Sequence, residues 1–217
     1  MEPDKPGTPI VVEPDLAVKP VVVRDGLALD RCLDDVANEP VIAVDTETTG
    51  LSPFDSRVRL VQLAVPGRQY VIDCDAVPVL ADARFRAMME GEKPYKVLHH
   101  AKFDCRMFDH HAAGLRMGGV FDTLIASQLV EAGISPEGGH SLAGVARRHL
   151  GVVLDKTEQV SDWRGELSER QIEYAAIDAA VLLPLRERMR SELIRLRLTK
   201  VATLEFDLVP VIARMEN

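Results

Sequence analysis

Two acidic residues, Asp45 and Glu47, follow the apolar run 41–44, which predicts a buried strand. Residues two apart on a strand point to the same side, so both carboxylates would leave one face of the sheet together. Two like charges held that close repel each other, and each resists losing its water. A hard divalent cation such as Mg²⁺ or Mn²⁺ removes the conflict, because it binds carboxylate oxygens and keeps positions open for phosphate. The alternative is a pair of solvated acids at a strand end.

Three more residues suit the same chemistry. Asp104 lies just past the expected strand 96–99, at the start of a helix. Tyr174 and Asp178 are four apart on an expected long helix, so both side chains project from one face. Each has a structural alternative: Asp104 would be favourable charge near a helix N-terminus, and Tyr174 a core aromatic. Asp178 stands in an apolar run, where a carboxylate is costly unless a metal or partner meets it.

Four acids and a tyrosine suit metal-assisted hydrolysis of a phosphodiester. Two cations about 3.5–4 Å apart would stabilise the attacking and leaving oxygens of an in-line displacement. Tyr174 would orient the attacking water, which one cation has made more acidic.

The composition bounds the class of protein. At 217 residues the chain fits one domain with a substantial core. No stretch approaches the roughly 18 apolar residues of a membrane span, and the first residues are no signal peptide, so a cytoplasmic protein with no membrane partner is expected. Cys32, Cys74 and Cys105 are scattered, which indicates free thiols and no zinc site.

The net charge of −8, taken at face value, argues against a nucleic-acid binder. Part of the acid load would be neutralised around a metal, however, and basic residues concentrate late in the chain, at 147–148 and 186–200. The alternative for that late run is the solvated face of a helix.

The elements that must position these residues form an α/β pattern. The proline-rich segment 1–20 predicts a flexible arm. Strands are expected at 21–23, from 41 into the acidic pair, at 58–65, 69–73, 96–99 and 120–121, and helices at 26–37, 79–90, 101–113, 122–131, 141–150 and from 168 onward. The prediction is a mixed sheet of about five strands flanked by helices.

Five residues mark helix ends or kinks. Asp122 is expected to cap the helix that follows it, and Gly151 to end the helix 141–150. Ser168 and Gln171 have the spacing of a capping box. Pro184 should kink the long helix without ending it, because apolar residues resume beyond it.

The ordered motifs Asp45-x-Glu47, Asp104 and Tyr174-x-x-x-Asp178 resemble the DEDD exonuclease superfamily in its tyrosine subtype. The resemblance covers roughly 40–200, with supporting stretches at 58–64, 121–129, 140–143, 154–156 and 161–163. It implies a ribonuclease H-like fold and the removal of nucleotides one at a time from 3′ ends.

Two branches of the superfamily compete: the proofreading domain of bacterial and phage DNA polymerase I, and ribonuclease D. The tail 204–217 resembles the junction where the polymerase part begins, and 48–51 and 101–104 lean the same way. The favoured division is therefore an arm at 1–20, an exonuclease domain at 21–200 and a tail at 201–217, excised from a longer polymerase or standing alone.

The expected activity is release of nucleoside 5′-monophosphates from single-stranded DNA 3′ ends, and a covalently linked polymerase region is a possible partner. A ribonuclease D-like exoribonuclease and an inactive nucleic-acid-binding module of the same fold are the alternatives. All the acids are present, which disfavours the inactive module.

Carried over by motif position, the resemblance implies that Asp45 touches two divalent cations, Mg²⁺ or Mn²⁺. Glu47 and Asp178 would complete one metal site, and Asp104 would hold the second ion through water. Tyr174 would position the nucleophile.

The resemblance also implies contacts to the substrate. Leu51 matches a leucine that packs against the terminal base in the polymerase branch. Thr46 and Phe103, inside the matched motifs, are further candidates. His100 stands where that branch usually has asparagine, which puts a substrate contact and the preference for DNA in question.

Overall fold

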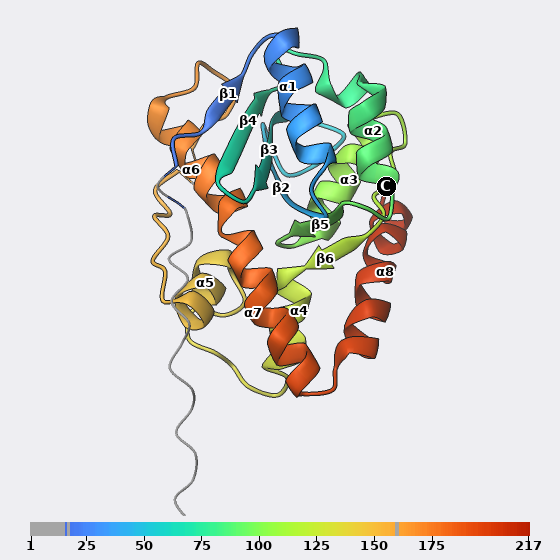
Figure 1. Cartoon of the computed structure of the whole chain (residues 1–217), viewed down its shortest axis with the longest axis vertical. Coiled ribbons are helices and arrows are strands. Elements are labelled where there is room, and N and C mark those ends of the chain that lie inside the picture. The colour runs from blue at the N-terminus through green and yellow to red at the C-terminus, as the bar shows by residue number, and fades with distance from the viewer. Residues whose placement is uncertain (1–15, 17, 159–160) are drawn as a thin grey trace, which may run out of the picture.

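The computed structural model describes residues 16, 18–158 and 161–217. Its centre is a mixed six-stranded sheet in the order β1-β4-β3-β2-β5-β6 (Figure 1). The strands are β1 (Val21–Val23), β2 (Val41–Thr48), β3 (Val58–Val65), β4 (Arg68–Asp73), β5 (Tyr95–Leu98) and β6 (Val120–Asp122). The sequence predicted about five strands. The two edge strands have three residues each, and both lie at positions where short strands were expected, 21–23 and 120–121.

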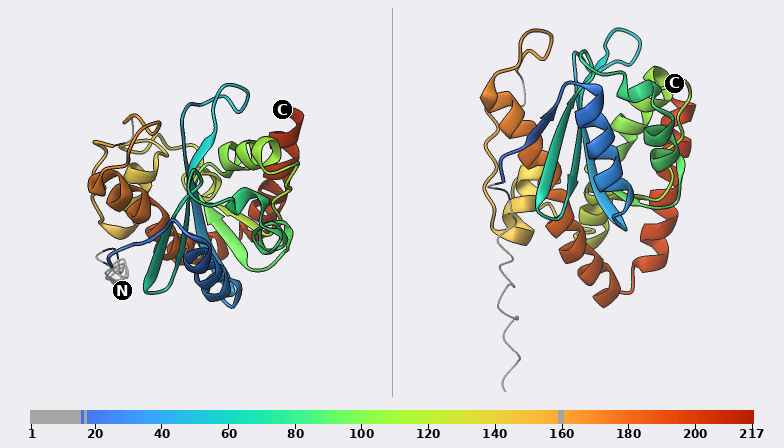
Figure 2. Two further views of the ribbon diagram at one scale, coloured as in Figure 1. Left: turned by 90° about the horizontal axis from the view of Figure 1, so that it is seen from above. Right: turned by 45° about the horizontal axis from the view of Figure 1, so that its top comes forward.

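Helices cover both faces of the sheet (Figure 2). They are α1 (Gly26–Ala37), α2 (Ala83–Glu90), α3 (Ala101–His111), α4 (Thr123–Val130), α5 (Leu142–Leu150), α6 (Glu169–Ala180), α7 (Leu182–Arg195) and α8 (Thr199–Met215). No helix among the described ranges is both long enough and apolar enough to cross a bilayer. The three cysteines are free thiols, as expected.

The pairing of β2 fixes where the acidic pair points. β2 runs antiparallel to β3 and parallel to β5, with Asp45 opposite Gln62 and Glu47 opposite Leu60. Leu60 packs with Ala175 and Ala176 of α6. Directly opposite residues share a face, so both acids point toward α6, as the sequence predicted.

The other face of the sheet carries the larger core. Side chains of β2, β3 and β5 pack there against α1, α2, α3 and two residues of α8, including Ile42, Leu63, Phe85, Phe108 and Val209. The Phe85 and Phe108 rings meet edge to face, with centroids 5.8 Å apart. This core holds α3, and hence Asp104, against the sheet.

Two predicted helices are divided. The segment expected as one helix at 79–90 is a 3₁₀ turn (Val79–Ala81) followed by α2, because Asp82 is extended and its carboxylate accepts the first N–H groups of α2. The long helix breaks at Val181, between α6 and α7, and not at Pro184. Proline has no N–H and its ring clashes with the carbonyl four residues back, so Pro184 fits only in the first turn of α7.

The C-terminal residues form most of α8, which begins at Thr199. Val209 and Ala213 join the larger core, and α8 lies against α3. Lys102 Nζ of α3 is 2.9 Å from Glu216 Oε1, so the end of the chain is tied to the helix that carries Asp104.

Asp122 caps two helices at once. As predicted, its carboxylate accepts the N–H of Leu124 at 2.8 Å and of Ile125 at 3.4 Å, at the start of α4. It also accepts the N–H of His100 at 3.0 Å and of Ala101 at 2.8 Å, at the start of α3. One buried carboxylate therefore fixes the start of the helix that carries Asp104.

Replacement of Asp122 should cost more stability than the loss of a cap that serves one helix. We expect Asp122→Ala to lower the free energy of unfolding by about 2–4 kcal/mol, since a single cap contributes about 0.5–2 kcal/mol and further buried N–H groups lose their acceptor. The matched control is Asp82→Ala, whose carboxylate accepts two N–H groups of α2 alone. Urea unfolding of both variants tests this, and equal losses would contradict the double cap.

Candidate active site

The sheet edge at the end of β2 gathers the acidic residues that the sequence singled out. The pKa of Asp45 is raised well above its usual range, first because burial removes water and then because Asp104, Glu47 and Asp178 place negative charge nearby. Burial, followed by the charges of Asp178 and Asp104, raises the pKa of Glu47 to about 9. Residues far apart in the chain therefore act on one another electrostatically at one place.

Asp104 reaches this edge from the side of the sheet opposite to α6. It is 3% exposed on α3, and burial raises its pKa to about 7. The Thr46 hydroxyl donates a hydrogen bond to Asp104 Oδ1 at 2.7 Å. Thr46 lies between Asp45 and Glu47 on β2 and points to the other face. Its hydroxyl thus fixes the orientation of the Asp104 carboxylate. Thr46 is only 7% exposed, so little of its surface is accessible for the contact with substrate that the sequence predicted.

Tyr174 and Asp178 share one face of α6, as their spacing predicted. The phenol is hydrogen-bonded to the Asp178 carboxylate. Burial is the main reason that the pKa of Asp178 rises to about 6, and Lys156 nearby opposes the rise. Burial, then the charge of Asp178, raises the pKa of Tyr174 far above its usual range. The phenol therefore keeps its proton near neutral pH.

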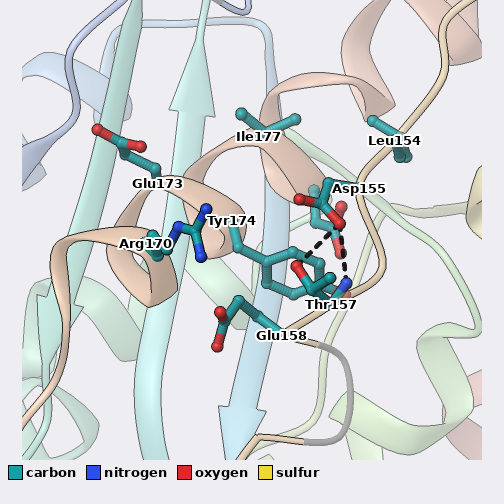
Figure 3. Close-up of a pocket in the computed structure, with 9 residues that line it drawn as sticks. Leu154, Asp155, Thr157, Glu158, Arg170, Glu173, Tyr174 and Ile177 are labelled. Atoms are coloured by element: carbon teal, nitrogen blue, oxygen red, sulfur yellow. Dashed lines mark hydrogen bonds between the residues drawn. The ribbon is translucent and has the colours of Figure 1, made fainter.

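A pocket of about 140 Å³ opens beside this pair. In Figure 3 the Tyr174 ring lies between α6 and the segment 154–158, with Thr157 and Glu158 beside it. Asp155 accepts hydrogen bonds from the Thr157 N–H at 2.9 Å and hydroxyl at 2.8 Å, which shapes that wall. Arg170 and Glu173 line the pocket from α6.

Two residues that follow the segment 154–158, Trp163 and Arg164, lie between Tyr174 and the loop after β2. Trp163 is 5% exposed, and its ring centroid is 6.4 Å from that of Tyr174. The Arg164 guanidinium donates to the Thr49 carbonyl at 3.4 Å. Leu51 in this loop is 83% exposed. An apolar side chain so exposed, in the loop that follows the acidic pair of β2, is available to a ligand.

His100 and Phe103 flank the start of α3. His100 is exposed and has φ 65°, ψ 46°, the left-handed conformation. Asparagine and histidine are among the few residues enriched in that conformation, so the change from the usual asparagine is compatible with this backbone. Phe103 is half-buried against the larger core.

Two residues at the site, Lys156 and Gln62, were not predicted from the sequence. Lys156 lines a pocket with Tyr174 and Asp178, and its positive charge opposes the rise in the pKa of Asp178 that burial causes. The stretch 154–156 was matched to the superfamily, but a lysine in the sequence does not by itself indicate which acidic residue it will lie beside in the fold. Gln62 lies opposite Asp45.

The donor set fits hard divalent cations, which bind carboxylate oxygens. Within residues 16, 18–158 and 161–217, no three His, Cys, Asp or Glu side chains are already arranged as metal ligands. Asp104, for example, is turned to the Thr46 hydroxyl. The mutual effect of the charges depends less on such rotamers, because Coulomb energy falls slowly with distance. The repulsion among the carboxylates, and not a set of side chains already arranged as ligands, identifies this edge as the candidate metal site.

Comparison with known proteins gives one family. Residues 20–194 match the family model described as 3′–5′ exonuclease. The chain is 33% identical over 200 residues to DNA polymerase I of Aquifex aeolicus. The aligned region covers 87% of this chain and 31% of that protein. The chain is 28% identical over 170 residues to ribonuclease D of Cronobacter turicensis, covering 76% and 43%. The chain thus spans less than half the length of either relative.

Solved structures confirm the ribonuclease H-like fold. Escherichia coli RNase D superposes with a TM-score of 0.79 at 26% identity, covering 89% of this chain and 50% of that one. Brucella melitensis NrnC with bound Mg²⁺ gives a TM-score of 0.73 at 29% identity, and the same protein bound to pGG gives 0.74 at 30%. Both NrnC comparisons cover 84% of this chain and 87% of the other.

The crowded acids predict how stability depends on pH. Because the folded-state pKa values of Glu47, Asp104 and Asp178 lie above those of an unfolded chain, the folded state holds protons that the unfolded state releases. In EDTA, the free energy of unfolding should therefore fall as the pH rises from about 5.5 to about 8.5.

Urea unfolding of the wild type and Asp45→Asn measures this slope. The variant removes one charge from the cluster, so its loss of stability over the same range should be smaller. Added Mn²⁺ should stabilise the wild type more at the higher pH, because metal binding requires ionised ligands. Equal slopes for the two proteins would contradict the electrostatic assignment.

Proposed function

The chain belongs to the 3′–5′ exonuclease family, and from that premise we propose that it removes nucleotides from the 3′ end of single-stranded DNA with two divalent cations. The strongest support is that Asp45, Glu47, Asp104 and Asp178 lie close enough at one sheet edge for their charges to raise the pKa values of Asp45 and Glu47. Acids that destabilise one another as anions are suited to binding cations, and this family depends on divalent metals.

In this proposal Asp45 would contact both cations. Glu47 and Asp178 would complete one site, and Asp104 would serve the second through water. When bound, the cations would neutralise charge on the scissile phosphate and make a water molecule more acidic. The protein's part is to keep four oxygen donors at one edge. β2 supplies two of them, α6 one and α3 one.

Tyr174 orients the attacking water in this proposal. A phenol keeps its proton at neutral pH even at its usual pKa, and burial raises the pKa of Tyr174 further when no cation is bound, so we assign Tyr174 no role as a general base. A neutral hydroxyl that donates to Asp178 still has lone pairs that accept a hydrogen bond from water. Its role is therefore to position the nucleophile, not to ionise it.

Contacts to the 3′ end would come from the neighbouring loops. Leu51 offers an exposed apolar surface to the terminal base. Lys156 and Arg170 bring positive charge to the pockets beside Tyr174, where a phosphate would lie. Aromatic residues are only 5% of the chain, so phosphate and metal contacts should outweigh extended base stacking.

A second candidate function is trimming of RNA 3′ ends. It is supported by the similarity to ribonuclease D and to NrnC, which has been solved bound to pGG and is matched over 87% of its length. The similarity of the tail to the start of a polymerase, and the match to a DNA polymerase I, favour DNA. A linked polymerase region stays a proposal on the same grounds.

Removal of Asp45 should abolish cleavage without unfolding the protein. We expect Asp45→Ala to lower the rate on a 5′-labelled oligonucleotide in Mn²⁺ by several orders of magnitude, because Asp45 would contact both cations. Tyr174→Phe should lose roughly 10²-fold, since the metal ligands stay in place. Full activity of Asp45→Ala would contradict the assignment of the site.

Matched oligonucleotides decide the substrate. A DNA and an RNA strand of the same sequence, digested with Mg²⁺ or Mn²⁺, should both shorten stepwise if the site reads only the phosphate backbone, with DNA faster if the polymerase-type proposal holds. Faster cleavage of RNA would favour the second candidate, because a protein separates the two through the 2′-hydroxyl. The released products should be nucleoside 5′-monophosphates.

A further inference from the structure

Gln62 is a buried polar side chain that the proposed mechanism does not yet use. It lies in the middle of β3 and is 0% exposed. Neither Nε2 nor Oε1 has a hydrogen-bond partner within the part of the chain that the structure describes. An unpaired buried amide lowers the free energy of unfolding by about 1–3 kcal/mol, so Gln62 destabilises the fold at this position.

The register places Gln62 beside Asp45. The two residues are directly opposite each other on β3 and β2, which puts their side chains on one face with Cβ atoms about 4.5–5.5 Å apart. From that distance a glutamine carboxamide can reach an aspartate carboxylate on the neighbouring strand.

The residues that pack around Gln62 offer few other hydrogen-bonding groups. On one side Leu60 packs with Ala175 and Ala176, and on the other Ala64 packs with Ala179 and Ala180. These alanines let α6 lie close to the sheet, and their side chains hold no donor or acceptor. Gln69 on β4 is a second buried amide near this row, and it has an interaction of its own.

We propose that Gln62 is a positioning residue for Asp45: its carboxamide, which makes no hydrogen bond to any described residue, rotates so that Nε2–H donates to one oxygen of the ionised Asp45 carboxylate and turns the other oxygen toward Glu47 and Asp178. The inference rests on the proposed function, since the positioned oxygen is the one that would meet the cations. No covalent step is involved.

The chemistry of an amide suits this task. Its N–H stabilises an anionic oxygen, yet it carries no charge that would compete with a cation or add to the acidic cluster. Glutamate at the same place would add a fifth negative charge, and methionine would keep the shape while removing the donor. Partners that orient metal ligands typically change affinity or activity by about 10–100-fold when removed.

The experiment compares Gln62→Met with Leu60→Met. Leu60 is equally buried, on the same strand and face, and opposite Glu47, so its replacement controls for a change in packing. Mn²⁺ binding is measured by calorimetry, folding by urea unfolding, and cleavage of a single-stranded oligonucleotide as separate kcat and KM values.

In EDTA, Gln62→Met should fold at least as stably as the wild type, because the amide makes no hydrogen bond to the residues that the structure describes and is replaced by an apolar group of similar shape. Its Mn²⁺ affinity and kcat should each fall about 10–100-fold, with KM for the oligonucleotide within about twofold. Leu60→Met should leave Mn²⁺ affinity and kcat unchanged. A Gln62→Met variant that binds Mn²⁺ and cleaves like the wild type would overturn the inference alone.

Two other outcomes also decide. A Gln62→Met protein that unfolds would contradict the inference, since it would show that the amide stabilises the fold. A wild type that neither binds Mn²⁺ nor cleaves would overturn the proposed function, and the role of Gln62 with it. Gln62→Glu should weaken cleavage further than Gln62→Met, because the added charge repels the neighbouring acids.

Discussion

Mutual repulsion among four carboxylates at the end of β2 is the constraint on which the rest of this structure depends. Burial and the neighbouring charges both favour the protonated forms of Asp45 and Glu47. A chain that collapsed freely would spread these acids into water. The fold keeps them together because each is attached to an element whose position is set by apolar packing elsewhere.

That packing comes from two independent layers. α6 reaches the sheet through alanines and carries Asp178, while α3 lies in the larger core and carries Asp104. β2 runs between them and presents alternate residues to both sides. Thr46 is the point where the layers meet, since it stands between the two acids of β2 and bonds the acid of α3. Because each helix carries one acid of the site, a shift of either α3 or α6 would displace a carboxylate.

The sequence was sufficient wherever a local rule applied. Alternation placed Asp45 and Glu47 on one face, helical spacing paired Tyr174 with Asp178, and the capping box at Ser168 formed as expected. The break at Asp82 was missed because it depends on one extended residue whose carboxylate caps α2. The long helix was expected to be disturbed at Pro184, and it divides three residues earlier because a proline disrupts the turn that precedes it.

Long-range contacts were beyond the sequence. The second helix capped by Asp122 is α3, which begins just after the neighbouring strand β5, and only the parallel pairing of β5 with β6 brings Asp122 to its first N–H groups. The bond from Thr46 to Asp104 and the place of Gln62 likewise follow from strand order and register. Local periodicity says which face a residue occupies, and not which residue of another strand it will meet.

The most direct test of the account is the anomalous diffraction of a crystal soaked in Mn²⁺. The account predicts strong peaks at the sheet edge, bound to oxygens of Asp45 and shared with Glu47 and Asp178 at about 2.0–2.3 Å, the range expected for a hard divalent cation. Peaks that lie elsewhere, with Asp45 left uncoordinated while the crystal is saturated with Mn²⁺, would contradict it.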